Sequence, residues 1–526
     1  MGVPRSIVIV GGGTAGWMCA VYLNHAFGRR VDITLVESPA IGTIGVGEAS
    51  FNTLKSFFDT VGLSEADWMP PSQGTYKLAI RFVDWNSARR TFYHPFQRYD
   101  DVDGLGLVEW WLHTRSATET FDDACFTAPA LCDAALAPKT LDGTPFEHRV
   151  AYPYGYHFDA TLLGNYLRTV AVQRGVRHVQ GTVGAIDVDE TGNVTRVHLD
   201  AERALEGELF IDCTGFRGLI ARQALDEPWE SFSDSLLCDR ALALRVPYRD
   251  SHEPIRPHTT ATAQSAGWVW DIPLKQRVGT GYVYSSAFID DDAAAEEFRA
   301  HLGVPAEEFD PMPIRFRSGR LRNSWVNNCV ALGLSGSFVE PLESTTIFFI
   351  QYELLQLLNH IPDGSGDREV RASFNRVLAD CVDGVRDFLV MHYHCSDRVD
   401  TPFWRATKTA LVVPDELAQR LALWRHRLPS ASSVNPRYHG FYPYSYVVMM
   451  LGMTEHRPPS HPLLQFADAL RAAPAFAALS QTRRELCAVL PTHRDYLDAL
   501  YDGQDNDGDG DRGSRAHGLA EPGRVR

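Results

Sequence analysis

A glycine-rich segment near the N-terminus, GGGTAG at residues 11–16, is the feature that most constrains the fold of this chain. It follows a short β-branched run at residues 6–10 and precedes helical spacing at 15–27 and a second apolar run at 31–37, a pattern that predicts a β-α-β unit. Glycines there let backbone N–H groups approach a pyrophosphate, which the helix N-terminus stabilises. Glu37 closes the second strand, where a carboxylate can accept hydrogen bonds from ribose hydroxyls. The unit predicts dinucleotide binding, with a tight structural turn as the alternative.

Two later stretches favour FAD over NAD. Residues 208–215 (ELFIDCTG) form an apolar run that ends in small residues, and residues 329–341 (CVALGLSGSFVEP) form another. Together with the N-terminal glycines they spread the cofactor site over more than 300 residues of the sequence. An extended FAD fits such a site better than a compact NAD does.

Composition limits the partners and the compartment. The chain has 526 residues, of which 44% are hydrophobic, enough for one large domain or two fused ones. Its net charge of −16 argues against nucleic acid and anionic membranes as partners. The nine cysteines are scattered without a C-x-x-C pair, which is typical of reduced thiols and not of disulfides or a zinc site. Without an N-terminal signal peptide or an apolar run of 18 residues, a soluble cytoplasmic protein is expected.

In the rest of the chain, residue patterns typical of sheet and of helix occur in separate segments. Residues 268–286 are rich in aromatic and β-branched residues and predict sheet, whereas helical periods dominate from about 346 to 428. We therefore expect an α/β (α+β) fold, with a FAD-binding module at 1–345, a mainly helical substrate-binding region at 346–502 and a disordered tail at 503–526. The tail contains DNDGDG, the start of a calcium loop, but its twelfth position is Ala516 where a bidentate Glu is needed, so no metal site is expected.

One lysine is unexpected. Lysine occurs only at 55, 77, 139, 275 and 408, and arginine is the usual cation elsewhere. Lys77 nevertheless lies in an alternating, mostly apolar strand pattern, GTYKLAIRF at 74–82. By itself this pattern also suits a strand lysine whose amine reaches solvent.

Three segments together resemble the flavin-dependent tryptophan halogenases. WVWDIP at 268–273 matches their W-x-W-x-I-P signature, EPLEST at 340–345 matches their E-P-L-E-S-T turn, and GTYKLAIRF resembles the strand that carries their essential lysine. The likeness runs from residue 6 to roughly residue 500. It implies a Rossmann-type FAD domain of the flavin monooxygenase kind and an enzyme that uses reduced FAD, O2 and chloride or bromide to halogenate the indole ring of tryptophan.

The resemblance implies specific roles. Lys77 would hold the hypochlorous acid, which a compact ammonium on a flexible stem can do and a planar guanidinium cannot. Glu343 would polarise the oxidant or accept the proton lost from the ring. The bulky Trp268 and Trp270 would keep the flavin away from the organic substrate; packing in the core is the alternative for this pair.

Chloride in this family rests against backbone amides just after the E-P-L-E-S turn, here those of Thr345 and Thr346. The family often has glycine at the position of Thr346, so a side chain there narrows the expected halide pocket. The cofactor-binding residues implied are Gly11, Gly13, Thr14, Ala15, Gly16, Glu37, Ser38, Ile41, Glu48, Ala49, Val183, Leu334 and Ile347.

The substrate pocket is expected around His94 and Phe96, which resemble the pair that sandwiches the indole, with Phe51 beside them. Residues 437–453 lack the Phe-Trp pair with which many relatives close over free tryptophan, so free tryptophan and tryptophan within a peptide both remain open. The stretches FNTLKSFF and FYHPF…EWW look most like the branch that halogenates C5. The HYHC motif at 392–395 is discounted as a metal site, because residues two apart on a helix point away from each other.

A separate flavin reductase is expected as a partner, because no second strand–glycine–helix unit is visible for NAD(P)H. The competing hypotheses are a flavin-dependent aromatic hydroxylase and a flavin-binding partner protein without turnover. The sequence leaves the oligomeric state and the halide preference open.

Overall fold

The computed structural model describes most of the chain. The residues described are 3–42, 45, 47–114, 119–141, 153–199, 202–361, 367–434 and 439–505. Within them no helix is both long enough and apolar enough to cross a membrane.

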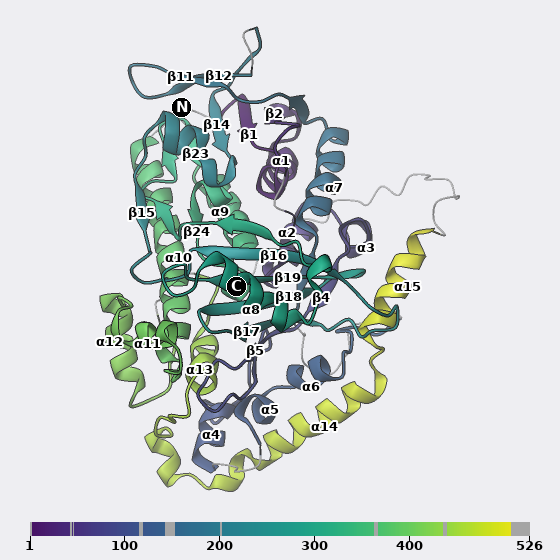
Figure 1. The fold of residues 1–526 in the computed structure, drawn as a ribbon, viewed down its shortest axis with the longest axis vertical. Coiled ribbons are helices and arrows are strands. Elements are labelled where there is room, and N and C mark those ends of the chain that lie inside the picture. Colours follow the sequence, from purple (N-terminus) through teal and green to yellow (C-terminus); the bar gives the residue numbers. More distant parts are fainter. Residues whose placement is uncertain are drawn as a thin grey trace.

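A six-stranded sheet forms the upper part of the molecule in Figure 1, in the order β10-β2-β1-β14-β23-β22. Its strands are parallel except for β22, which runs antiparallel to β23. The bounds are β1 Ser6–Val10, β2 Asp32–Glu37, β10 Arg177–Gln180, β14 Leu209–Asp212, β22 Trp325–Val326 and β23 Cys329–Ala331. The predicted β-α-β unit and the two later apolar strands are thereby confirmed.

Two glycines allow the close approach of α1 (Thr14–Phe27) to this sheet. Gly11 has φ +115°, and a Cβ there would lie 2.2 Å from the carbonyl oxygen of Cys213. A Cβ at Gly16 would lie 1.9 Å from the carbonyl oxygen of Gly11. Both positions therefore require glycine, which explains the motif through backbone packing.

A seven-stranded sheet crosses the middle of the molecule, in the order β20-β16-β19-β18-β17-β5-β6 (Figure 1). Its pairs are antiparallel except for β17 and β5, which are parallel. The bounds are β5 Ala79–Val83, β6 Phe92–Pro95, β16 Arg240–Pro247, β17 His258–Ala263, β18 Gly267–Pro273, β19 Arg277–Tyr284 and β20 Met312–Arg315. The sheet predicted at 268–286 is confirmed as β18 and β19.

The stretch around Lys77 is not the single strand that its alternation predicts. β4 (Thr75–Lys77) belongs to a three-stranded sheet with β3 (Glu48–Ala49) and β9 (Gly155–Phe158), and β5 begins two residues later in the larger sheet. The break falls at Leu78, whose N–H donates to the carbonyl oxygen of Pro257 and whose carbonyl accepts from the N–H of Phe96. Lys77 therefore lies where two sheets meet.

The remaining strands form small sheets of two or three strands. Their members are β7 Asp101–Val102 with β8 Leu105–Gly106, β11 Ala185–Val188 with β12 Val194–His198 and β13 Ala204–Glu206, and β15 Trp229–Ser231 with β21 Gly319–Leu321 and β24 Ser337–Phe338.

Helices surround the two main sheets. The bounds in the first part of the chain are α2 Thr53–Thr60, α3 Glu65–Trp68, α4 Leu107–Thr114, α5 Phe121–Cys125, α6 Ala128–Asp133, α7 Ala160–Gln173 and α8 Asp291–Leu302. Those in the second part are α9 Thr346–Asn359, α10 Asp367–Cys395, α11 Pro402–Thr409, α12 Asp415–Trp424, α13 Pro443–Gly452, α14 Ala473–Val489 and α15 His493–Asp505. The helices predicted from 346 to 428 are confirmed as α9 to α12.

The C-terminal helices return to the first part of the chain. α14 packs against α5 and α6 along the lower edge of the molecule (Figure 1). The predicted division at residue 345 stays a prediction. The tail expected from residue 503 begins inside α15, which continues to Asp505, and the rest of that tail lies outside the described residues.

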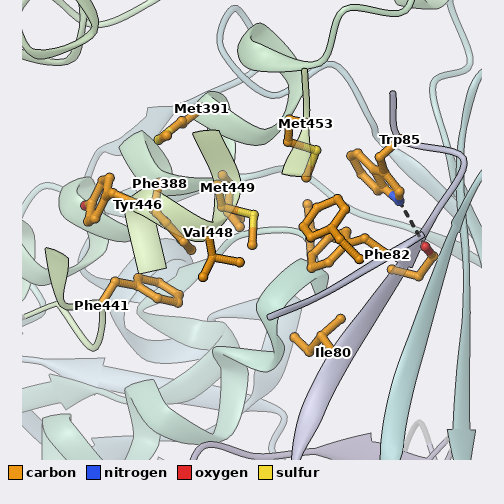
Figure 2. Packing of buried hydrophobic residues seen from close by; sticks show 14 of the residues in the cluster. Ile80, Phe82, Trp85, Phe388, Met391, Phe441, Tyr446, Val448, Met449 and Met453 are labelled. Atoms are coloured by element: carbon orange, nitrogen blue, oxygen red, sulfur yellow. Dashed lines mark hydrogen bonds between the residues drawn. The ribbon is translucent and has the colours of Figure 1, made fainter. Parts of the chain in front are cut away.

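An aromatic core joins the seven-stranded sheet to α10 and α13. Figure 2 shows Phe82 and Trp85, from β5 and the residues after it, facing Phe388 of α10 and Met449 of α13. Trp85 is fully buried, and its indole N–H donates to the carbonyl oxygen of Ala261 at 2.9 Å. Because each buried aromatic side chain stabilises the fold by roughly 1.5–3 kcal/mol, this cluster fixes α10 firmly over the sheet.

Gly16→Ala should destabilise the protein by at least about 2 kcal/mol, because its Cβ would overlap a backbone carbonyl, although alanine normally favours a helix interior by about 1 kcal/mol. Gly13→Ala is the matched control: Gly13 is the N-cap residue of α1 with φ −72°, and its Cβ would meet no heavy atom within 4 Å, so it should lose only the roughly 0.5–1 kcal/mol by which alanine is the poorer N-cap residue. Urea unfolding without added flavin measures both. Equal stability of the two variants would contradict the packing role of Gly16.

Candidate active site

Lys77 is fully buried, and its Nζ donates to Oγ of Ser344 at 3.0 Å. The same Nζ lies 5.3 Å from the ring centroid of Phe96, within the range of a cation–π contact. The reading of Lys77 as a strand lysine that reaches solvent is therefore wrong. Burial lowers its pKa to about 7, against the opposing effect of the Glu343 charge. Burial thus favours the neutral amine form of Lys77 at a lower pH than in a solvated lysine.

A carboxylate whose two oxygens both have hydrogen-bond partners, that of Glu65, supports the strand that carries Lys77. Glu65 accepts hydrogen bonds from the hydroxyls of Tyr76, Tyr154 and Tyr156 at 2.7–2.8 Å and pairs with Lys139. Tyr76 is the residue before Lys77 on β4, so the cluster fixes the position of the strand. An unpaired buried carboxylate would be costly, and here every oxygen has partners.

Glu343 and Ser344 lie in a turn of unusual backbone conformation. Their φ angles are +69° and +60°, in the left-handed region that non-glycine residues rarely adopt. Such residues cost roughly 1–3 kcal/mol each and persist only where their surroundings hold them. In this turn the Ser344 hydroxyl meets Lys77 and the Glu343 carboxylate meets two histidines.

The buried carboxylate of Glu343 lies between two imidazole rings. His94 Nδ1 is 2.9 Å from Oε2, and His392 Nε2 is 3.0 Å from Oε1. Burial alone would oppose ionisation, but electrostatic attraction to His94 and the hydrogen bonds with His392 and His94 outweigh it and hold the pKa of Glu343 well below its usual value. Glu343 is therefore an anionic acceptor in a site from which solvent is nearly excluded.

Two cavities meet at this turn. The larger, of about 470 Å³, runs along the carboxyl ends of the six-stranded sheet, and we call it the flavin-side cavity. The smaller, of about 380 Å³, lies on the side of β6 and α13, and we call it the substrate-side cavity. Ile80 and Glu343 line both. Lys77 contacts Ser344, which lines the first, and Phe96, which lines the second, and so lies between them.

The flavin-side cavity fits an extended dinucleotide. All of the expected cofactor residues line it except Gly16, which packs behind it: Gly11, Gly13, Thr14, Ala15, Glu37, Ser38, Ile41, Glu48, Ala49, Val183, Leu334 and Ile347. Gly13 faces open space at the start of α1, which leaves room for a phosphate beside the helix N-terminus.

The carboxylates of Glu37 and Glu48 both line this cavity. A Cβ at Gly12 would lie 1.7 Å from Oε2 of Glu37, so that glycine makes room for the acid at the end of β2. His178 Nε2 lies 2.8 Å from the other Glu37 oxygen. The second carboxyl belongs to Glu48, and burial raises its pKa to about 7.

Trp268 and Trp270 lie on one face of β18, two residues apart, and both line the flavin-side cavity. Their ring centroids are 6.2 Å apart, and both side chains are nearly fully buried. They are core residues and cavity walls at once, so the two interpretations from sequence do not exclude each other.

The residues expected at the halide follow directly after the turn. Thr346 is the first residue of α9, whose first amides have no acceptor within the helix, and it lines the flavin-side cavity. Thr345 is fully buried, and its hydroxyl has no hydrogen-bond partner among the described residues. Free donors of this kind suit a small anion.

The substrate-side cavity contains all three residues expected to bind an aromatic ring, His94, Phe96 and Phe51. The ring centroids of Phe51 and Phe96 lie 6.3 Å apart, edge to face. Phe441 and Tyr444 add further aromatic wall from the segment in which the sequence departs from the family pattern. A volume near 380 Å³ lies within the roughly 300–1,000 Å³ of small-molecule sites.

His392 is the residue that the sequence interpretation missed. No group of three metal-binding side chains occurs in the described part of the chain. His392 nevertheless faces inward and contacts Glu343. Its spacing of three and four residues from Leu389 and Phe388, both fully buried, is the signal that places it on the inner face of α10.

The comparisons with known proteins agree with this geometry. Residues 6–469 match the family model described as tryptophan halogenase. The tryptophan 6-halogenase of Streptomyces toxytricini is 44% identical over 516 residues, covering 94% of this chain and 98% of that protein. The tryptophan 7-halogenase of Kutzneria sp. (strain 744) is 39% identical over 536 residues, covering 95% and 99%. The solved structure of Tar14, a tryptophan C-6 flavin-dependent halogenase (chlorinase) from taromycin biosynthesis, matches with a TM-score of 0.91 at 46% identity, covering 94% and 99%.

Lys77→Met should raise the stability of the protein. A lysine whose pKa falls from 10.5 to about 7 on folding destabilises the native state fully below pH 7, and the cost disappears as pH rises towards 10.5. We expect a gain of about 2 kcal/mol at pH 6 that is smaller at pH 9.5, measured by thermal unfolding. Lys139→Met is the control and should lose stability at both values, because it leaves Glu65 without its cation. A loss of stability in Lys77→Met at pH 6 would contradict the burial argument.

Proposed function

Because this chain belongs to the flavin-dependent tryptophan halogenase family, we propose that it chlorinates the indole ring of tryptophan at C6 with reduced FAD, O2 and chloride. The C5 position expected from sequence is not supported, because the relatives described above are named for C6 and C7. Family membership also disfavours the two competing hypotheses, an aromatic hydroxylase and a partner protein without turnover. The observation that carries the proposal is the burial of Lys77 between the two cavities.

Lys77 delivers the chlorine. Bound reduced FAD supplies, with O2 and chloride, hypochlorous acid on the flavin side. The neutral amine of Lys77 hydrogen-bonds this acid or displaces water from it to form an N–Cl bond, and it then presents electrophilic chlorine to one ring carbon. A pKa near 7 supports this role, because an ammonium has no lone pair for the chlorine. The hydrogen bond to Ser344 fixes the amine at the passage.

Glu343 takes the ring proton. After chlorine adds to the carbon, the same carbon must lose its proton to restore aromaticity. Glu343 accepts this proton and passes it to the group that released the chlorine, which is the nitrogen of Lys77 when the N–Cl bond breaks, or hydroxide, which leaves as water, when hypochlorous acid reacts directly. A carboxylate that lines both cavities is suited to that transfer. Burial of the pair keeps water from competing for the oxidant.

The remaining residues prepare the reactants. Donors at Thr345 and Thr346 hold chloride beside the flavin, and Trp268 and Trp270 prevent the flavin from approaching the organic substrate. Because the sequence has one strand–glycine–helix unit of the nucleotide-binding kind, a separate flavin reductase supplies reduced FAD. The choice between chloride and bromide follows from the size of the halide pocket, which the Thr346 side chain narrows.

Free tryptophan is the proposed substrate. Arg98 lines the mouth of the substrate-side cavity, and its guanidinium lies 3.9 Å from the ring centroid of Tyr442. No described residue forms an ion pair with it. Free tryptophan carries a carboxylate that this cation can bind, whereas tryptophan inside a peptide carries none.

Lys77→Met and Lys77→Arg should each reduce chlorination at least about 100-fold while FAD still binds. Mass spectrometry of tryptophan incubated with a flavin reductase, NADH, FAD, O2 and chloride detects the chlorine isotope pattern, and NMR of the product assigns the ring position. Product with an added oxygen and no chlorine would favour a hydroxylase. Chlorotryptophan formed equally by the variants would remove Lys77 from the reaction.

Arg98→Gln should raise KM for tryptophan about 10- to 100-fold with little change in kcat, because a hydrogen bond to a charged group contributes about 1.5–3 kcal/mol. Tryptamine, which lacks the carboxylate, is the internal control, and its KM should not change. An equal rise for both substrates would mean that Arg98 acts on the shape of the cavity and does not recognise the carboxylate.

A further inference from the structure

Both ring nitrogens of the fully buried His392 face oxygen atoms. Nδ1 lies 2.7 Å from the backbone carbonyl oxygen of Phe388, and Nε2 lies 3.0 Å from Oε1 of Glu343. A carbonyl oxygen only accepts hydrogen bonds, so Nδ1 carries a proton. An ionised carboxylate also only accepts, so with Glu343 ionised Nε2 must carry a second proton. With Glu343 ionised, the two contacts together require an imidazolium, whereas a protonated Glu343 would leave the ring neutral.

His94 differs from His392 in this respect. Its Nδ1 lies 3.0 and 2.9 Å from the two oxygens of Glu343, and its ring lines the substrate-side cavity. No described residue accepts a hydrogen bond from its Nε2. A neutral ring protonated on Nδ1 satisfies these contacts, so the requirement for a second proton falls on His392 alone.

We propose that His392 is a charged positioning residue, an imidazolium that forms a permanent buried ion pair with Glu343 and thereby leaves the pair without net charge beside Lys77. The inference rests on the proposed roles of Glu343 and Lys77. His392 itself touches neither the substrate-side nor the flavin-side cavity.

The surroundings of the pair support a fixed charge. His392 is 0% exposed, so water does not solvate its ring. The rings of Phe388, Phe82 and Trp85 surround it, with centroids 4.8, 5.6 and 6.5 Å away. An imidazolium in such a place needs a counter-ion, and Glu343 is the carboxylate in contact with it. The other titratable groups that face the pair are Lys77 on β4, His94 on β6 and Tyr444 on α13.

The ion pair has a consequence for Lys77. A lone Glu343 carboxylate favours the ammonium form of Lys77, which cannot accept chlorine. An adjacent imidazolium cancels much of that field, so the amine stays neutral near pH 7. Removing the charge of His392 while keeping a hydrogen-bond donor should therefore make Lys77 harder to deprotonate.

The protonation state can be measured without flavin or turnover. In the full-length chain labelled with ¹⁵N at histidine, one imidazole should carry protons on both nitrogens at pH 7.5, and its signals should be absent from His392→Gln. Glutamine can place an uncharged N–H group where Nε2 stood. A His392 ring with a single proton at pH 7.5 would overturn the proposal, whatever the protein does to tryptophan.

The effect on Lys77 is read from the pH profile of chlorination. In His392→Gln, the pH at which kcat reaches half of its maximum should be higher than in the parent by about one pH unit, so that activity recovers at higher pH. His394→Gln, two residues along the same helix, is the matched control and should keep the parent profile. A uniform loss of kcat at every pH in His392→Gln would mean a structural role only. Absence of chlorination in the parent protein would count against the proposed function and leave the NMR result to decide the ion pair.

Discussion

Two consecutive non-glycine residues in the left-handed region, Glu343 and Ser344, stand where the two cavities meet. The strain of this turn is offset by the contacts of its side chains: Glu343 contacts His94 of β6 and His392 of α10, and Ser344 accepts a hydrogen bond from Lys77 of β4. Three separate elements are thus tied to one turn. Both contacts of Glu343 are buried, and Lys77 is itself fully buried, so the loss of any partner leaves a polar group with little solvent, and the arrangement persists as a unit.

The position of Lys77 depends on the junction of two sheets. β4 pairs with β9 on one side, and the chain then crosses into the seven-stranded sheet at Leu78. A lysine in the middle of a long strand would face either solvent or a packed core. At the end of a three-residue strand its side chain instead extends into the space between two cavities, with the Glu65 cluster holding the strand behind it.

Local patterns predicted the parts of the fold that local chemistry decides. The β-α-β unit followed from adjacent strand, glycine and helix signals, and Lys77, Glu343 and the aromatic walls followed from motifs. The break at Leu78 was not predictable, because it depends on the carbonyl oxygen of Pro257, far away in sequence. The role of His392 was missed for the same reason: its partner lies 49 residues away, and a histidine two residues from another invited only a metal hypothesis.

One part of the wall of the substrate-side cavity comes from a different segment of the chain than the groups that hold Glu343 and Lys77, whereas His94 and Phe96 belong to both. Phe441, Tyr442 and Tyr444 belong to residues 439–445, at the start of α13, and of these only Tyr444 lies near the Glu343 carboxylate. Residues 439–445 therefore shape one side of this cavity, while the contacts of Lys77 come from Ser344 and Phe96. An exchange of this short segment would therefore change the shape of the cavity without removing the hydrogen bond between Lys77 and Ser344 or the contacts of Glu343 with His94 and His392.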